Sequence, residues 1–354
     1  MKVFAGHDGG SGCSWYRMTL PLGELDAADD DFEVTFADAG DSVSHKPIIT
    51  AAMLQGYDII VGQRWNKHDG MSVWRGARTP FSRLVFETDD DVFSITADNW
   101  PAYKHFGRPD VQDAVEHMAA TADLVTVTTE PLAAVMRELN PSVAVLPNCI
   151  PGWACSLPRE PAPRPRVGWM GGASHGVDVG IVVEPVRRFL KRFPGWDLQI
   201  NATDYRQTFA GSGVPGDRMT HVRWVQVNAE PEKFYSSIDF DIGLCPLWPT
   251  TFSRSKSAIK AIEYGARGIP VIATDCPAYS GVITHGVDGF LVKAEHEWLK
   301  YMSELAGDDE LRAKMGEAAR DMARRHLIED HWTKWRDAYT GLFRRLQPGQ
   351  RMVS

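Results

Sequence analysis

The chain alternates short apolar runs with longer segments in which apolar residues recur every three or four positions. The runs are rich in β-branched residues and are bounded by Gly, Asp or Asn. Such runs are typical of strands that are buried on both faces of a parallel sheet, and the longer segments are typical of amphipathic helices. In the first half the predicted strands are residues 2–5, 32–36, 57–61, 83–87, 123–128 and 143–146.

A proline-dense stretch, PGWACSLPREPAPRPR at residues 151–166, interrupts this alternation. Proline cannot continue a helix or donate to a central strand, so we interpret the stretch as a linker. Alternation resumes with predicted strands at residues 166–170, 196–201, 221–225, 240–244, 269–273 and 289–292. The pattern predicts an α/β protein with two tandem, doubly wound, Rossmann-like parallel-sheet domains, at residues 1–150 and 167–328.

The tail from Asp308 onward has a helical pattern. Trp332, Trp335, Tyr339 and Leu342 recur at three- and four-residue spacings and form an apolar stripe. Stripes of this kind more often pack in a core than bind a ligand.

The amino-acid composition and net charge indicate which kinds of molecule the protein binds. Of 354 residues, 44% are hydrophobic and 24% are charged, which is typical of globular proteins. The net charge of -8 provides no overall basic surface for nucleic acid, so small-molecule partners are favoured. No signal-peptide pattern or apolar run near ~20 residues occurs, so we expect a cytoplasmic protein without a transmembrane segment. Five scattered cysteines without a CxxC pair disfavour disulfides and zinc.

The segment SRSKSAIKAIEYGARGIPVIATD, residues 253–275, has the strongest local pattern. It predicts a helix with Lys256, Lys260 and Glu263 on one face, preceded by Arg254 and Ser255. Backbone N–H groups beside cationic side chains suit a diphosphate, and a glutamate suits sugar hydroxyls. A solvated Lys/Lys/Glu face with ordinary pairing explains the same residues equally well.

A second segment, VGWMGGASHGVD at residues 167–178, predicts a strand that ends at Gly171 and Gly172 and a helix that begins near Val177. Glycines at such a turn let the backbone approach a phosphate. His175 either contacts that ligand or serves as a helix-capping or core histidine.

The first half offers a glycine-rich loop, GHDGGSGCSWYRMTLP, which contains Gly10 and leads into a helix with Tyr16 and Arg17. Its glycines at 6, 9, 10 and 12 do not fit G-x-G-x-x-G, which disfavours a Rossmann dehydrogenase.

Three carboxylates, Asp89, Asp90 and Asp91, follow the predicted strand 83–87. They stand at the sheet edge where open α/β folds bind ligands. Adjacent carboxylates persist only with hydrogen-bond donors, a metal or solvent, so a metal site of the D-x-D kind is a rival interpretation.

The run EYGARGIPV, residues 263–271, resembles the glutamate-to-Gly-x-Pro-Val segment of the family-4 retaining glycosyltransferases (glycosyl transferases group 1). There the glutamate is the second of an E-x7-E pair and holds the donor ribose; Glu263 matches it, and Ser255 replaces the first. The Lys-Ser-x-x-Lys segment and the Asp-Asp stretch resemble a divergent subgroup of that family.

The resemblance implies a GT-B fold, with two domains facing a cleft and a C-terminal helix, residues 329–346, packed back on the N-terminal domain. It implies catalytic roles for Asp90, Arg254 and Lys256, the two cations neutralising the departing diphosphate. It implies a donor site of Gly171, Gly172, His175, Ser255, Lys260 and Glu263. On the acceptor side it implies Gly10, Tyr16, Arg17, Asp89 and Asp91.

The implied function is transfer of a sugar from a nucleotide-sugar to an acceptor hydroxyl, with retention. We expect no cofactor besides the nucleotide-sugar co-substrate, and no metal, because D-x-D metal sites belong to the other, single-sheet glycosyltransferase architecture. A nucleotide-sugar epimerase of the same architecture and a catalytically silent binding protein are the alternatives. The acceptor can be a glycan, a lipid, a protein or a hydroxymethylated DNA base.

Overall fold

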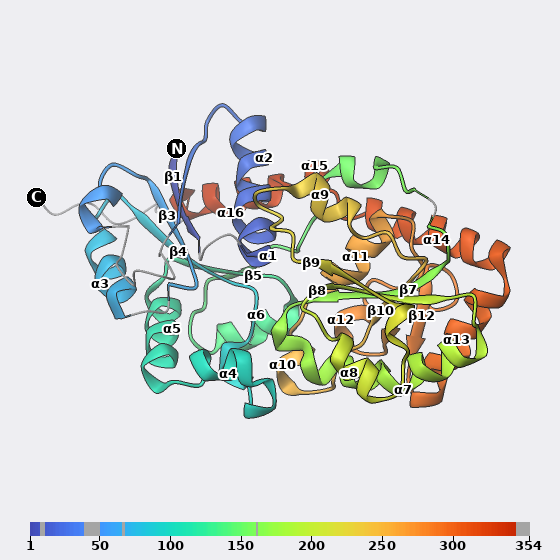
Figure 1. Cartoon of the computed structure of the whole chain (residues 1–354). Coiled ribbons are helices and arrows are strands. Elements are labelled where there is room, and N and C mark those ends of the chain that lie inside the picture. Colours follow the sequence, from blue (N-terminus) through green and yellow to red (C-terminus); the bar gives the residue numbers. More distant parts are fainter. Residues whose placement is uncertain (8–10, 39–49, 66–67, 161, 345–354) are drawn as a thin grey trace, which may run out of the picture. The chain divides into compact units, whose positions relative to one another are not determined.

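The computed structural model describes residues 1–7, 11–38, 50–65, 68–160 and 162–344 (Figure 1). The chain divides into two compact units. The first unit comprises Met1–Phe93, Phe106–Cys149 and Ile328–Ser354, and the second comprises Ser94–His105 and Ile150–Leu327. Each unit is built around its own parallel sheet.

The first unit has a six-stranded sheet in the order β2-β1-β3-β4-β5-β6. Helices α2 and α16 lie on one side of it and α3 and α5 on the other (Figure 1). The strands are β1 (Lys2–His7), β2 (Glu33–Asp38), β3 (Ile59–Gln63), β4 (Arg83–Thr88), β5 (Leu124–Val127) and β6 (Val143–Val145). The helices are α1 (Gly12–Ser14), α2 (Leu20–Ala28), α3 (His68–Ala77), α5 (Pro109–Thr121), α6 (Glu130–Arg137), α15 (Ile328–His331) and α16 (Thr333–Arg344).

The second unit has a six-stranded sheet in the order β12-β11-β10-β7-β8-β9. Helices α11 and α14 lie on one side of it, and α7 and α8 lie on the other (Figure 1). The strands are β7 (Arg166–Gly171), β8 (Asp197–Ala202), β9 (Met219–Arg223), β10 (Ile242–Cys245), β11 (Val271–Thr274) and β12 (Gly289–Val292). The helices are α4 (Trp100–Phe106), whose last residue belongs to the first unit, α7 (Gly176–Arg192), α8 (Arg206–Gly211), α9 (Pro231–Ser236), α10 (Thr251–Arg254), α11 (Ile259–Ala266), α12 (Pro277–Ser280), α13 (Glu295–Gly307) and α14 (Asp309–Arg324).

The fold prediction is confirmed: both sheets are parallel, and each predicted strand overlaps an observed one. Burial explains why the strands could be predicted from the sequence. For example, β3 is buried at all five positions and needs an apolar or small residue at nearly every one. No helix in the described part of the chain is both long and apolar enough to cross a membrane.

The terminal helix α16 contributes to the core of the first unit. Trp335, Tyr339 and Leu342 are buried in the same cluster as Val3 of β1, and Trp332 packs against that cluster while partly exposed. The apolar stripe of the tail is therefore a packing surface.

The proline-dense stretch is attached to the second unit. The buried Arg267 guanidinium donates to the carbonyls of Leu157 and Pro158 at 2.7 and 2.8 Å, and Arg159 donates to the Phe240 carbonyl at 2.7 Å. These bonds satisfy carbonyls in a stretch where proline limits backbone pairing.

Small residues allow α11 and α14 to cross closely. A Cβ on Gly265 would lie 2.5 Å from the Ala319 carbonyl oxygen, and one on Gly316 would lie 2.4 Å from the Gly268 carbonyl oxygen. Gly268 itself has a φ of +66°, which favours glycine. The glycines of the GARG segment therefore bring the chain close to its neighbours.

Candidate functional site

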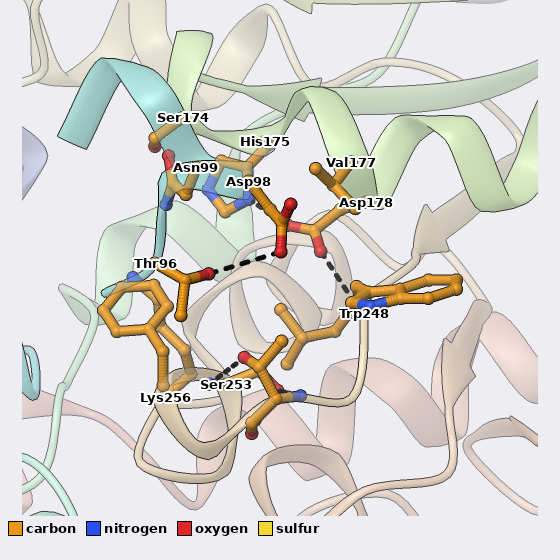
Figure 2. Close-up of a pocket in the computed structure, with 13 residues that line it drawn as sticks. Thr96, Asp98, Asn99, Ser174, His175, Val177, Asp178, Trp248, Ser253 and Lys256 are labelled. Carbon is orange, nitrogen blue, oxygen red and sulfur yellow. Dashed lines mark hydrogen bonds and ion pairs between the residues drawn. The ribbon is translucent and has the colours of Figure 1, made fainter. Parts of the chain in front are cut away.

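A pocket opens in the second unit, where the loops after β7 and β10 meet the segment Ser94–His105 (Figure 2). Its volume is about 510 Å³, part of it open to solvent. Its lining combines hydroxyl, carboxylate, amide, imidazole, ammonium and aromatic groups. The lining residues are Thr96, Asp98, Asn99, Ser174, His175, Val177, Asp178, Leu247, Trp248, Thr250, Phe252, Ser253 and Lys256.

The loop after β7 brings the start of helix α7 to this pocket. A Cβ on Gly171 would lie 2.5 Å from the Trp169 ring and 3.2 Å from the His175 ring, so Gly171 is required by packing. The space next to the Gly172 Cα is open. Among the described residues no side chain caps the start of α7, and its first turn contains Val177, which lines the pocket. Backbone N–H groups at the start of a helix attract anions.

A hydrogen-bonded chain joins the two loops (Figure 2). The Asp178 carboxylate accepts from the Trp248 backbone N–H through Oδ1 at 2.7 Å and contacts His175 Nδ1 through Oδ2 at 2.7 Å. On the other side of the imidazole, His175 Nε2 lies 3.0 Å from Lys260 Nζ. Lys260 belongs to α11, so three separate segments are tied together here.

Protonation in this chain follows from burial. Burial lowers the pKa of His175 to about 4, the Lys260 ammonium lowers it further, and the bond to Asp178 opposes the shift. The imidazole is therefore neutral at pH 7, with its single hydrogen on Nδ1 facing Asp178. Burial also lowers the pKa of Lys260, and the Asp178 carboxylate opposes that shift.

The short helix α10 places Lys256 at the pocket. Thr250 and Ser253 form a reciprocal capping box, with bonds of 3.1 and 2.8 Å, and so define the start of α10. The chain leaves α10 at Arg254, and Lys256 Nζ lies 4.4 Å above the centre of the Phe252 ring. The prediction of one helical face carrying Lys256, Lys260 and Glu263 is therefore wrong: α11 begins only at Ile259, so Lys256 precedes it.

The other expected donor residues lie apart from the lining. Arg254 is exposed at the end of α10, and Ser255 and Glu263 are each only 4% exposed. None of the three lines the pocket formed by the described residues, and neither do Gly171, Gly172 and Lys260.

Sequence reasoning missed one wall of the pocket. Thr96, Asp98 and Asn99 come from the segment Ser94–His105, and Trp248, which is 51% exposed, comes from the loop after β10. An accessible indole beside carboxylate and amide groups suits a ligand with both apolar C–H faces and hydroxyl groups. The only sequence signal was position, because both segments follow predicted strands.

In the first unit the carboxylates after β4 are held by an arginine. Arg64 Nη2 donates to Asp89 Oδ1 and to Asp90 Oδ2, the latter at 3.1 Å. Arg64 follows β3 directly and has a φ of +50°, an uncommon conformation for a non-glycine residue. Asp91 is buried and accepts from the Phe93 backbone N–H at 3.3 Å. Sequence reasoning missed Arg64, although it follows a predicted strand as the aspartates do.

Arg17 requires a correction. We expected it on the acceptor side, but its guanidinium is buried and bound to Glu87 at 2.7 and 3.2 Å and to Asn148 at 3.1 Å. It is a core residue of the first unit and is not accessible to a ligand. Tyr16 is also buried, at 5% exposure, and Gly10 lies outside the described residues.

Metal ligation was the rival interpretation of the aspartates. Within the described ranges, no group of three or more His, Cys, Asp and Glu side chains is arranged to hold a metal ion. Arg64 supplies the hydrogen bonds that adjacent carboxylates need.

Comparison with known protein families matches one segment of the chain. Residues 250–322, which include Lys256, Lys260 and Glu263, match the sequence model of the glycosyl transferases group 1. No curated protein was found to match the chain.

Several solved structures share the fold. Sucrose-phosphate synthase from Thermosynechococcus elongatus has a TM-score of 0.68 and 16% identity, covering 97% of this chain and 99% of that one. HepE from Anabaena, in complex with UDP, has a TM-score of 0.66 and 14% identity, covering 96% and 100%. TarM has a TM-score of 0.57 and 14% identity over 79% of this chain, which spans only 54% of TarM. The chain therefore has the GT-B fold of these structures, and its segment similar to the glycosyl transferases group 1 contributes to the pocket.

Proposed function

We propose that this protein is a glycosyltransferase that moves a sugar from a nucleotide-sugar to an acceptor hydroxyl, with retention and without a metal. We also propose that the pocket of the second unit binds the donor. The observation that carries the proposal is that one pocket combines groups that suit a diphosphate with groups that suit a sugar. The uncapped start of α7 and the Lys256 ammonium suit a diphosphate, while Trp248, Asp98 and Asn99 suit a sugar.

In the proposed reaction the bond between the anomeric carbon and the diphosphate oxygen breaks. That oxygen takes the proton of the acceptor hydroxyl on the same face, and the hydroxyl oxygen bonds to the anomeric carbon. No enzymic base is required, and His175 is unsuited to act as one because its Nε2 accepts from Lys260. Lys256, Lys260 and Arg254 would neutralise the charge that develops on the diphosphate.

The nucleotide is inferred from the relatives. HepE was solved with UDP, so UDP-sugars are the first donors to test. We assign Glu263 to the donor ribose by its place in the family segment, and Asp90 to the orientation of the acceptor hydroxyl or the sugar.

The test is a thermal-shift screen of UDP-, GDP- and ADP-sugars, followed by turnover with glycan, lipid, protein and modified-DNA acceptors. A donor stabilises the fold by RT ln(1 + [L]/Kd), about 2.7 kcal/mol at 100 times Kd. Failure of every nucleotide-sugar to stabilise the chain would contradict the proposal. Altered stereochemistry of a nucleotide-sugar without acceptor would show an epimerase, and binding without turnover would show a silent binding protein.

A further inference from the structure

Asp178 contacts both loops of the pocket but has no part in the proposed reaction. We propose that Asp178 is a positioning residue: it fixes the tautomer of His175 and thereby holds the Lys260 ammonium beside the donor diphosphate. This inference rests on the proposed function of the pocket. It assigns a role to a carboxylate that a phosphate-binding site would otherwise be expected to exclude.

The directions of the hydrogen bonds carry the argument. An ionised carboxylate only accepts, so the hydrogen between Asp178 Oδ2 and His175 Nδ1 belongs to the imidazole. A neutral imidazole has one hydrogen, so Nε2 is an acceptor. Lys260 Nζ, 3.0 Å from Nε2, is the donor that this tautomer requires. In the other tautomer, with the hydrogen on Nε2, the His175 N–H and the Lys260 ammonium would both be donors and would face each other.

The second oxygen of Asp178 makes the arrangement specific. Oδ1 accepts from the Trp248 backbone N–H at 2.7 Å, so both carboxylate oxygens face donors. An asparagine has one oxygen and one NH₂ group. It would either lose the bond to Trp248 or present its NH₂ group to His175, which would force the wrong tautomer.

Charge supports the same role. The groups that face Lys260 are the imidazole of His175, the Asp178 and Glu263 carboxylates, the Cys245 thiol and the Lys256 ammonium. Burial and Lys256 lower the pKa of Lys260, whereas Asp178 is the largest influence that raises it. Without the Asp178 charge, the pKa of Lys260 falls further. As the pH is raised, the loss of diphosphate binding should therefore begin at a lower pH than in wild type.

The experiment measures the Kd of UDP, GDP and ADP for wild type and Asp178→Asn from about pH 6 to about pH 10. For the diphosphate that binds wild type best, we expect Kd to rise roughly tenfold and the alkaline loss of binding to move down by about one pH unit. Glu184→Gln is the matched control, because it removes a carboxylate from the same helix in an exposed pair with Arg187. That control should keep the wild-type profile.

His175→Gln and His175→Ala supply a second test. Glutamine can accept from Lys260 and donate to Asp178, so His175→Gln should bind the diphosphate more tightly than His175→Ala. An alkaline limb unchanged in Asp178→Asn, or equal affinities for the two His175 variants, would overturn the role of Asp178 while leaving the proposed function standing. Failure of all three diphosphates to bind wild type would overturn both.

Discussion

Arg17 and Glu87 form a two-point ion pair inside the first unit, with side-chain exposures of 0% and 2%. Both nitrogens Nε and Nη2 of Arg17 donate to the carboxylate, which also accepts from the Thr126 hydroxyl. Arg17 Nη1 donates to the Leu146 carbonyl and to Asn148. The pair therefore connects the helical segment after β1 with β4, β5 and the end of β6.

Removal of one partner should destabilise the first unit strongly. We expect Arg17→Met to lower the free energy of unfolding by about 3 to 5 kcal/mol, because the Glu87 charge is left buried and unpaired. Urea denaturation measures the loss. The exposed pair Lys2–Glu33 is the control, and Lys2→Met should cost less than about 1 kcal/mol. If Arg17→Met with Glu87→Leu is as unstable as Arg17→Met alone, unpaired charge is not the cause.

Acid should weaken the second unit through His175. Its pKa falls from 6.5 to about 4 in the folded protein, so between these values the unfolded chain binds more protons. Stability therefore falls as the pH drops through this window, by roughly 3 kcal/mol. His175→Gln should lose less stability than wild type between about pH 7 and pH 4.5, as followed by denaturation at each pH. Parallel losses in the two proteins would contradict the neutral, buried imidazole.

The crossing of α11 and α14 should not tolerate a methyl group. Gly265→Ala places a Cβ 2.5 Å from the backbone oxygen of Ala319, which cannot move without shifting α14. We expect a loss of about 1 to 3 kcal/mol in thermal or urea unfolding. Gly180→Ala is the matched control, since nothing lies within 4 Å of its added Cβ inside α7, and it should stabilise by up to about 1 kcal/mol. Equal effects at the two sites would contradict the close crossing.

We expect the proposed transferase activity to survive EDTA, because Arg64 forms ion pairs with Asp89 and Asp90 and supplies the positive charge that these carboxylates need. The measurement is turnover of the donor identified in the thermal-shift screen, before and after chelation. Loss of activity with recovery on addition of manganese or magnesium would show that the aspartates are metal ligands.

Lys256→Ala should lower kcat by about ten- to a hundredfold, with a smaller change in KM. The diphosphate gains negative charge as it departs, so a nearby ammonium stabilises the transition state more than the bound donor. Lys300→Ala is the matched control, because Lys300 also lies over an aromatic ring, that of Tyr301 at 4.8 Å, but outside the pocket. A raised KM with unaltered kcat would assign Lys256 to donor binding alone.

The sequence by itself determined the strands, because burial on both faces imposes a local composition. In β3 and β10 every position is buried, so a run of apolar residues in the sequence predicts each strand. The same reasoning applies to the tail, where the spacing of Trp335 and Tyr339 follows from the helical period. The group 1 segment could also be recognised from the sequence, because a motif depends on residues that are near in sequence.

Only the tertiary structure decided which side chains meet. Arg17 and Glu87 are 70 residues apart, and Lys260 and His175 are 85 apart, so no local pattern relates the members of either pair. Strand order brings β7 beside β10, and the loops after them then converge on Asp178. An arginine or histidine has the same local pattern whether it binds a ligand or a buried carboxylate. Its role is decided by which distant partner the packed sheets place within about 3 Å of it, since hydrogen bonds act only at that range.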